Sequence, residues 1–315
     1  MEQEVRSMKK RYHNYDNVLN TKTFTDMLRW QRERRRNKKD LSKQIPQAKK
    51  KEIARLQQNR SDRSITWIGH STFLIQLEGL NIVTDPVWAS RMGVQKRLTE
   101  PGIPIEQLPE IDIVVISHGH YDHLDFGTIR KLKGTPVFYV PVGLKPLFTR
   151  RGYQHVVEAK WWDHFSYKGL QISFVPAQHW TKRSLTDTNT SHWGGWVIEA
   201  ANPKQSLYFA GDTGYFRGFQ DIADRFKLDI VLMPIGAYEP EWFMKVSHIN
   251  PEDAIKAFLE LKGQLFIPMH YGAYRLADDT GPEALERMYQ EWDRLQLNDE
   301  MLKVLAIGET YWIQK

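Results

Sequence analysis

Short apolar runs separated by turn residues dominate the chain from residue 64 onward. They predict strands over 64–77, 81–84, 112–117, 137–140, 156–158, 171–176, 193–199, 206–209, 229–233, 265–268 and 304–307. Apolar positions at helical spacing predict helices over 125–133, 144–150, 220–226, 252–262 and 283–295. The early strands come in hairpin-like groups, and single helices separate the later strands. We therefore expect an α/β fold with two mixed sheets packed face to face and helices outside.

The first 60 residues differ in kind from the rest of the chain. They hold 18 Lys and Arg against 7 Asp and Glu, a balance of +11, and they contain no glycine. A helix is expected over 23–36, and four of its side chains would face a partner surface: Phe24, Met27, Leu28 and Trp30. We divide the chain into a basic N-terminal extension, residues 1–60, and a main domain, residues 61–315.

Composition narrows the classes of protein that remain. The 315 residues are 41% hydrophobic, which excludes wholesale disorder, and the lack of cysteine excludes disulfides, thiolate metal sites and a cysteine nucleophile. The net charge of +6 belongs to the extension alone, because the main domain has 26 Lys and Arg against 31 Asp and Glu. No apolar signal segment and no run of about 18 apolar residues is present, so we expect a cytoplasmic protein without a transmembrane helix.

The basic extension has three interpretations at this stage. It is a solvated arm that packs in part on the main domain, or it attaches to anionic lipid headgroups, or it contacts nucleic acid. The charge count alone does not choose among them.

A dense group of metal-binding side chains follows the predicted strand 112–117. The sequence there is Ser-His-Gly-His-Tyr-Asp-His-Leu-Asp, which places His118, His120, Asp122 and His123 within six positions. Two His separated by one residue in an extended segment point to the same side, so both can reach one metal ion. The chain then turns toward a helix, which lets Asp122 and His123 face a neighbouring ion. Imidazole nitrogen and carboxylate oxygen suit divalent metals such as zinc, manganese and iron.

Three further potential ligands stand just after predicted strands. They are His179 after 171–176, Asp212 after 206–209, and His270 after 265–268. Ligand sites in α/β scaffolds collect at such strand ends. Together with the first cluster, these residues would complete two metal sites.

These residues together resemble the metallo-β-lactamase superfamily over about residues 64–310. The resemblance implies a four-layer αβ/βα sandwich with a dinuclear metal site in residues 61–315. His118, His120 and His179 would then bind the first metal, and Asp122, His123 and His270 the second, with Asp212 bridging them. Asp85, in Val-Thr-Asp-Pro, matches the acid that orients a ligand imidazole through its other N–H.

Within that superfamily the chain looks most like the N-acyl-phosphatidylethanolamine phospholipase D family. The matching stretches are 67–70, 84–86, 117–125, 178–180 with 182–183, 210–215, 234–240 with 242–245, and His248. The resemblance implies hydrolysis of a phospholipid headgroup phosphodiester, with release of phosphatidic acid. It also implies two divalent metal ions, which are Zn²⁺ in this family, peripheral membrane association on the inner membrane face, and a homodimer.

The resemblance also assigns catalytic roles to His248, Asp122 and Asp212. Two divalent metals about 3.5–4 Å apart can hold a hydroxide and clamp phosphate oxygens for in-line attack. His248 is the candidate that supplies a proton or charge stabilisation to the leaving alkoxide. The human member of the family has Gln before this His, whereas this chain has Ser247, so assistance from an amide at that position is in doubt.

Lipid recognition requires apolar surface near the metals. Candidate side chains lie next to the predicted site residues: Trp88, Met92, Trp180, Trp242, Phe243 and Met244. Lys182 and Arg183 are candidates to contact the phosphate, with a solvated loop charge pair as the alternative.

Three other functions compete with the phosphodiesterase interpretation. A nuclease of the same superfamily would use the basic extension to follow a nucleic-acid backbone, but nucleic acid is not the partner we expect. Only 58 positions separate Asp212 from His270, which leaves no room for the domain inserted in many such nucleases. A lactonase or amide hydrolase would use the same metals on an acyl centre. A catalytically silent binding module is the third, and the presence of all seven ligands argues against it.

Overall fold

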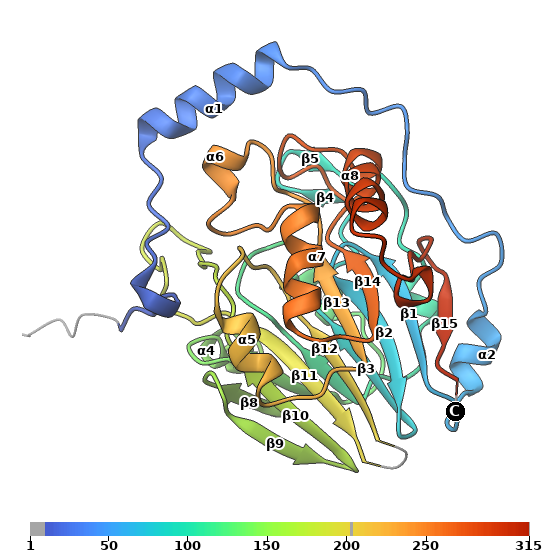
Figure 1. Ribbon diagram of the computed structural model, residues 1–315. Coiled ribbons are helices and arrows are strands. Elements are labelled where there is room, and N and C mark those ends of the chain that lie inside the picture. The colour runs from blue at the N-terminus through green and yellow to red at the C-terminus, as the bar shows by residue number, and fades with distance from the viewer. Residues whose placement is uncertain (1–9, 202–203, 315) are drawn as a thin grey trace, which may run out of the picture.

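Two mixed β-sheets form the centre of the protein (Figure 1). The computed structural model describes residues 10–201 and 204–314. In strand order, the first sheet contains β15 (Thr310–Trp312), β1 (Ser64–Gly69), β2 (Thr72–Leu77), β3 (Leu80–Thr84), β6 (Ile113–Val115), β7 (Val137–Pro141) and β8 (Val156–Ala159). The second contains β14 (Leu265–Met269), β13 (Ile230–Pro234), β12 (Gln205–Phe209), β11 (Gly195–Ala200), β10 (Leu170–Val175) and β9 (His164–Tyr167). Both sheets combine antiparallel and parallel pairs, which confirms the expected mixed sheets.

Helices cover the outer face of each sheet. On the first sheet these are α2 (Ile53–Gln58), α3 (Phe126–Ile129) and α4 (Lys145–Thr149), and on the second α5 (Gly218–Ala223), α7 (Pro251–Glu260) and α8 (Gly281–Arg294). The remaining short elements are α6 (Glu241–Met244), the hairpin β4 (Arg91–Met92) and β5 (Gln95–Lys96), and the 3-10 turns η1 (Tyr15–Asn17), η2 (Ile105–Gln107) and η3 (Asp299–Met301). The layers run helix, sheet, sheet, helix, as the four-layer sandwich requires.

The alternation of side chains along β2 explains how one strand serves two layers. Phe73 and Ile75 belong to the core between the sheets, whereas Leu74 belongs to the cluster under the helices of the first sheet. Successive strand residues point to opposite faces, and both faces of this strand are buried. A strand buried on both faces reads as a continuous apolar run, which is the pattern of residues 72–77.

The single strand predicted over 64–77 is wrong, because the chain reverses direction inside it. β1 ends at Gly69 and β2 begins at Thr72, and the two strands pair antiparallel. Gly69 has φ +123° and His70 has φ +56°, so the reversal depends on backbone conformations that hydrophobicity does not report. This turn carries His70 into the candidate site.

The strand predicted over 304–307 is also wrong. Leu305 and Ile307 are buried in the core, but their backbone lies outside the regular strands. The last strand is β15, which pairs with β1 through Ser64 and Trp312. Residues 304–307 contain apolar side chains because these are buried in the core. The edge strand of the sheet, β15, begins only at Thr310. β9 and α6 were missed because both are short and partly exposed.

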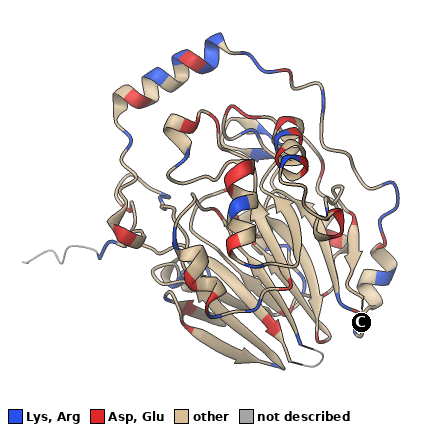
Figure 2. Cartoon of the chain, in the orientation of Figure 1, with Lys and Arg blue, Asp and Glu red and all other residues tan. Residues whose placement is uncertain are grey.

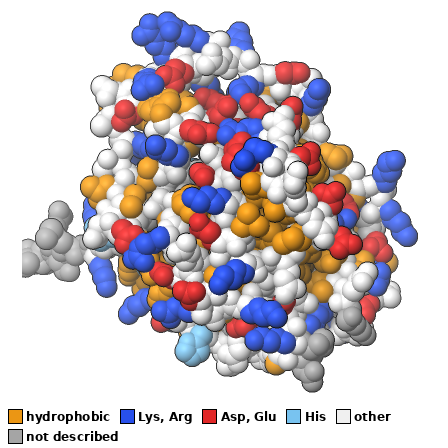
Figure 3. Space-filling view, viewed as in Figure 1, with side chains coloured by type: hydrophobic (Ala, Val, Ile, Leu, Met, Phe, Trp, Pro, Cys, Tyr) orange, Lys and Arg blue, Asp and Glu red, His pale blue; other side chains and the backbone are white. Residues whose placement is uncertain are grey.

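The described part of the N-terminal extension runs along the outside of the molecule as a long strap that carries two helices, α1 (Phe24–Arg36) and α2 (Figure 1). Thr23 caps this helix through a capping box with Asp26. Figures 2 and 3 show its basic side chains grouped at its C-terminal end, at the top of the view. The predicted helix at 23–36 is therefore present.

The strap contacts the main domain at separate points along its length. The Trp30 ring lies 4.9 Å from the Phe243 ring, and its Nε1–H donates to Asp278. Ile45 is buried in the core between the sheets. Burying one Ile side chain stabilises a fold by about 1.5–3 kcal/mol. Part of the extension therefore packs on the main domain as structure.

Candidate metal centre

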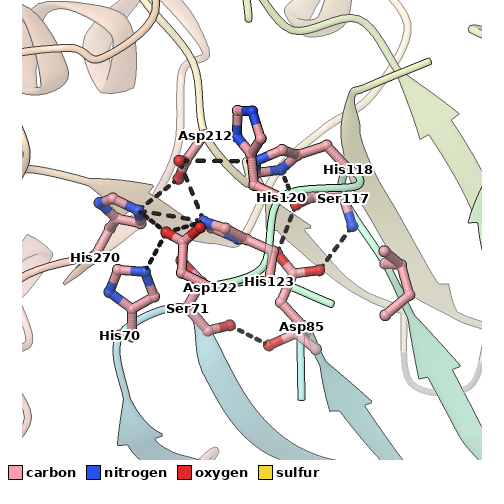
Figure 4. A network of polar contacts seen from close by, with 12 residues as sticks. His70, Ser71, Asp85, Ser117, His118, His120, Asp122, His123, Asp212 and His270 are labelled. Carbon is pink, nitrogen blue, oxygen red and sulfur yellow. Dashed lines mark hydrogen bonds and ion pairs between the residues drawn. The ribbon is translucent and has the colours of Figure 1, made fainter. Parts of the chain in front are cut away.

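The predicted ligands converge at one end of the two sheets (Figure 4). His118, His120, Asp122 and His123 lie in the loop after β6, and Asp85 follows β3. From the second sheet, His179 follows β10, Asp212 follows β12 and His270 follows β14. The loops that follow these strands therefore meet at one end of the two sheets, as expected for potential ligands that stand just after strands.

One group of ligands is formed by three imidazoles. His120 Nδ1 lies 2.9 Å from His118 Nε2 and 3.2 Å from His179 Nε2. One nitrogen of each ring therefore faces a common point, and His118 and His179 are fully buried. The other nitrogen of His120, Nε2, is buried and has no hydrogen-bond partner among the described residues.

A second group lies beside the first. His123 Nε2 is 3.3 Å from His270 Nε2, and Asp122 Oδ2 is 3.3 Å from His123 Nε2 and 3.7 Å from His270 Nε2. Nitrogen and carboxylate oxygen again face one point. This is the second ligand set that the resemblance implied.

Asp212 lies between the two groups. Its carboxylate is 3.2 Å from His123 Nε2 and 3.0 Å from His270 Nε2 in one group. It is 4.0 Å from His118 Nε2 and 3.9 Å from His179 Nε2 in the other. A carboxylate in this position can serve both groups at once. Gly211 makes the approach possible, because a Cβ there would lie 2.4 Å from the Cβ of Ser117.

The charges at the site fit divalent cations. Burial lowers the pKa of His118 and His179 well below its ordinary value and that of His120 to about 4, so these rings are neutral, the form that binds metal. Burial alone would raise the pKa of Asp212, but His123 and His270 lower it well below its ordinary value. Burial would lower the pKa of His270, but Asp212 and Asp122 raise it to about 9. Buried carboxylates thus demand positive charge here, which protonated imidazoles supply in part and divalent cations would supply in full.

Asp85 fixes the orientation of one ligand ring. Its Oδ2 lies 2.7 Å from His123 Nδ1 and accepts from the Ser117 hydroxyl, while its Oδ1 accepts from the Ser117 N–H. A carboxylate at Nδ1 leaves Nε2 of His123 free to bind metal. The Ser117 hydroxyl also lies 2.9 Å from His118 Nδ1, so the network reaches both ligand groups.

The structure adds His70 to the site, a residue to which the sequence interpretation gave no role. Its Nε2 lies 3.0 Å from Asp122 Oδ2, and its ring lies 4.0 Å from the ring of His270. His70 is buried and belongs to the same group of potential ligands as Asp122, His123 and His270. The stretch Trp67-Ile-Gly-His70 was part of the family resemblance, and that was its only signal in the sequence.

His248 lies at the edge of the site. Its Nδ1 is 3.7 Å from Asp212 Oδ2, and its ring lies 5.1 Å from that of His179. The backbone carbonyl of the preceding Ser247 accepts from His179 Nδ1 at 2.9 Å. The residue before His248 therefore supports a ligand through its backbone, which any side chain at that position would allow.

A cleft of about 790 Å³ opens above these residues. Its floor includes His120, Asp122, Asp212, His248 and His270, and its walls are mostly apolar. The wall side chains include Met27, Trp30, Met92, Trp180, Phe243 and Met244. Helix α1 of the extension thus supplies part of the wall.

Three of the substrate-binding candidates have other roles. Trp88 packs under the first sheet and donates to the Ile103 carbonyl, and Trp242 donates to Glu33 of α1. Arg183 donates to the carbonyls of Gly119, His120 and Leu124, so it holds the ligand loop and is not free to contact phosphate. Lys182 lines the cleft, as the phosphate-contact interpretation requires.

Comparison with known proteins gives relatives of this chain. Residues 80–271 match the family described as the beta-lactamase superfamily domain. An N-acyl-phosphatidylethanolamine-hydrolyzing phospholipase D from Caenorhabditis elegans is 37% identical over 267 residues, 78% of this chain and 74% of that protein. A mitochondrial protein of the same name from Saccharomyces cerevisiae is 35% identical over 243 residues, 72% of this chain and 52% of that protein. A metal-dependent hydrolase from Methanopyrus kandleri is 29% identical over 78% of this chain and 98% of its own length.

Solved structures share the fold. A metallo hydrolase from Ignicoccus hospitalis superposes with a TM-score of 0.61 at 24% identity, over 81% of this chain and 100% of that one. A possible metal-dependent hydrolase from Veillonella parvula gives 0.65 at 16% identity, over 80% of this chain and 100% of that one. These matches confirm the four-layer α/β architecture.

We expect Asp212→Asn to lose most of the bound metal, because one carboxylate faces both ligand groups. Metal analysis of purified protein after zinc loading and desalting measures this, with Asp224→Asn on the surface as the matched control. Retention of two ions per chain by the Asp212 variant would remove this residue from the centre.

We expect His70→Ala to weaken metal binding about tenfold or more, because loss of the Nε2 contact frees Asp122 to rotate. His70→Gln can still donate to Asp122 and should recover part of the affinity. Chelator competition with Zn²⁺ measures the change, with exposed His164→Ala as control. If His70→Ala bound Zn²⁺ as tightly as the unsubstituted protein, Asp122 would need no support from His70.

Proposed function

Since the chain belongs to the β-lactamase superfamily and, within it, to the N-acyl-phosphatidylethanolamine-hydrolysing phospholipase D family, we propose that this metal-dependent hydrolase cleaves phosphodiesters in glycerophospholipid headgroups. The observation that carries the proposal is a pair of ligand groups sharing Asp212 at the floor of an apolar cleft. A phosphodiester needs charge compensation at its oxygens, and acyl chains need apolar walls. This cleft combines both.

The residues already described would hold two divalent metal ions, for which we propose Zn²⁺ on the family resemblance. His118, His120 and His179 would hold one, and Asp122, His123 and His270 the other, with Asp212 shared. Two such metal cations supply Lewis acidity toward the phosphate ester and toward water. The protein's part is to hold the ligand side chains through Asp85, His70 and Ser247 and to keep the cleft apolar.

His248 would act on the leaving oxygen of the headgroup. Burial lowers the pKa of His248 to about 4, so the ring is neutral at pH 7. Its contribution is then a hydrogen bond from a neutral imidazole N–H, and not a proton from an imidazolium. Nearby cations would favour the neutral form further. Of the two roles expected of His248, proton supply and charge stabilisation, we therefore propose charge stabilisation.

The rim of the cleft supports docking on a lipid surface. Phe24 is 77% exposed, Val94 88% and Leu185 93%, and each lies within three residues of a cleft-lining residue. Arg32, Arg35 and Arg36 stand on α1, the helix that supplies Met27 and Trp30 to the cleft wall, where anionic headgroups would meet them. None of the described helices is long and apolar enough to cross a bilayer. We propose that this face attaches peripherally to an anionic membrane, such as the inner membrane face of a cell. We also propose a homodimer, for which family membership is the only support.

The apolar cleft argues against the nuclease alternative. A nucleic-acid groove is lined by cations that follow the phosphate backbone, whereas this cleft has Lys22, Arg91 and Lys182 among mostly apolar walls. The lactonase or amide hydrolase alternative would use the same ligands, so it is decided by assay.

We expect the metal-loaded full chain to release phosphatidic acid from at least one of three lipids presented in mixed micelles. These are phosphatidylethanolamine, its N-acylated form and cardiolipin, with products identified by mass spectrometry. Asp212→Asn is the inactive control, and a lactone and an RNA oligonucleotide are the competing substrates. Rapid cleavage of either competitor with no lipid product would overturn the proposal.

We expect His248→Ala to lower turnover of the active lipid about 10²–10³-fold while metal content stays unchanged, because one hydrogen-bond donor to the developing oxyanion is lost. His164→Ala is the matched control for a His outside the site. Unchanged turnover would show that the leaving oxygen needs no help from His248. Loss of metal would show instead that His248 belongs to the ligand set.

A further inference from the structure

Asn14 of the N-terminal extension is buried beside a ligand of the metal centre. Its side-chain Oδ1 accepts from the backbone N–H of His179 at 2.9 Å and from the Trp193 indole N–H at 2.9 Å. The two Asn14–His179 partners are 165 residues apart in sequence. Asn14 is only 8% exposed, so water cannot easily replace it as the acceptor.

Both sides of His179 are held in this way. Its backbone N–H donates to Asn14, and its ring Nδ1 lies 2.9 Å from the Ser247 carbonyl. The remaining ring nitrogen, Nε2, faces His120 and Asp212. Fixing the backbone and Nδ1 therefore fixes where Nε2 points, which is what a metal ligand requires.

The same segment reaches the other support of His179. Asn20 Nδ2 donates to the Ser247 hydroxyl at 2.6 Å, next to the carbonyl that holds the His179 ring and next to His248. Asn14 thus contacts the loop that carries His179, and Asn20 contacts the loop that carries His248. Residues 12–20, here called the N-terminal clamp, touch the centre at both points.

The N-terminal clamp is anchored by contacts that involve no potential metal ligand. Tyr12 donates its backbone N–H to Asn189 and stacks on the His192 ring at 4.6 Å. Arg217 donates to both carboxylate oxygens of Asp16, at 2.7 and 2.8 Å. The Asn14 amide also donates to the Val18 carbonyl, which closes the turn of η1 and fixes the direction of Oδ1.

We propose that Asn14 is a positioning residue for the metal ligand His179, so that the N-terminal clamp is a working part of the metal centre. This inference rests on the proposed function in one respect, that His179 binds metal. It follows that metal binding and seating of the clamp stabilise each other, because each favours the same arrangement of His179. The affinity of the centre for metal would then depend on the N-terminal extension, because the clamp is part of it.

Three variants of the full chain test the role of Asn14. Asn14→Leu keeps the volume and loses the acceptor, Asn14→Asp keeps an acceptor oxygen, and exposed Asn37→Leu is the matched control. Competition with a chromogenic chelator gives the Zn²⁺ affinity of each. We expect Asn14→Leu to bind Zn²⁺ about tenfold or more weakly, with Asn14→Asp recovering most of the loss and Asn37→Leu unchanged.

The unfolding temperature separates positioning from general destabilisation. We expect Asn14→Leu to show a smaller Zn²⁺-induced rise in unfolding temperature than the unsubstituted chain, since a ligand stabilises according to its affinity. An unchanged Zn²⁺ affinity and an unchanged rise in Asn14→Leu would overturn the proposal. A chain that binds no Zn²⁺ without any substitution would instead overturn the proposed function.

Limited proteolysis of the unsubstituted chain keeps the proposal testable if Asn14→Leu does not fold. We expect Zn²⁺ to slow cleavage within residues 10–20, because the metal favours the seated clamp, while cleavage at Lys168 in the exposed turn between β9 and β10 serves as the internal reference. Equal cleavage rates within residues 10–20 with and without Zn²⁺ would contradict the coupling.

Discussion

The buried carboxylate of Asp212 is the constraint on which the rest of the site depends. It lies within 4.0 Å of ring nitrogens from five histidines, where water cannot solvate it. An ionised carboxylate in such a place is stable only beside positive charge. The two sheets must therefore bring loops from both halves of the fold to one point. The four-layer sandwich does this because β6, β10, β12 and β14 all end at the same edge.

Local spacing and strand ends made most of the centre predictable. The cluster from His118 to His123 is visible in six positions of sequence, and Asp212 follows a clear apolar strand. His70 was not predictable, because its turn lies inside an apolar run that reads as one strand. That turn is set by positive φ at Gly69 and His70, and apolar residues on both sides hide it. His248 was found only through family resemblance, since nothing in its neighbours marks a site.

Asn14 shows a different limit of sequence interpretation. Its partner is 165 residues away, and a single Asn in a polar segment has no periodicity that could reveal a buried contact. The buried positions of the extension, Asn14 and Ile45 among them, are isolated and separated by exposed residues. Hydrophobic patterns detect elements that bury a whole face, so they do not detect a strap held at separate points.

The boundary between residues 60 and 61 therefore describes charge and not structural independence. Part of the positive balance of +11 comes from exposed side chains on α1 and the segment after it, such as Arg32, Arg35, Arg36 and Lys38. The same extension places Met27 and Trp30 in the wall of the cleft and Asn14 beside His179. The extension thus has two sides. Its exposed cations can meet an anionic surface, and its buried and cleft-lining residues complete the candidate site. A change that loosens this segment would alter both substrate access and the support of a ligand, because the same backbone carries both.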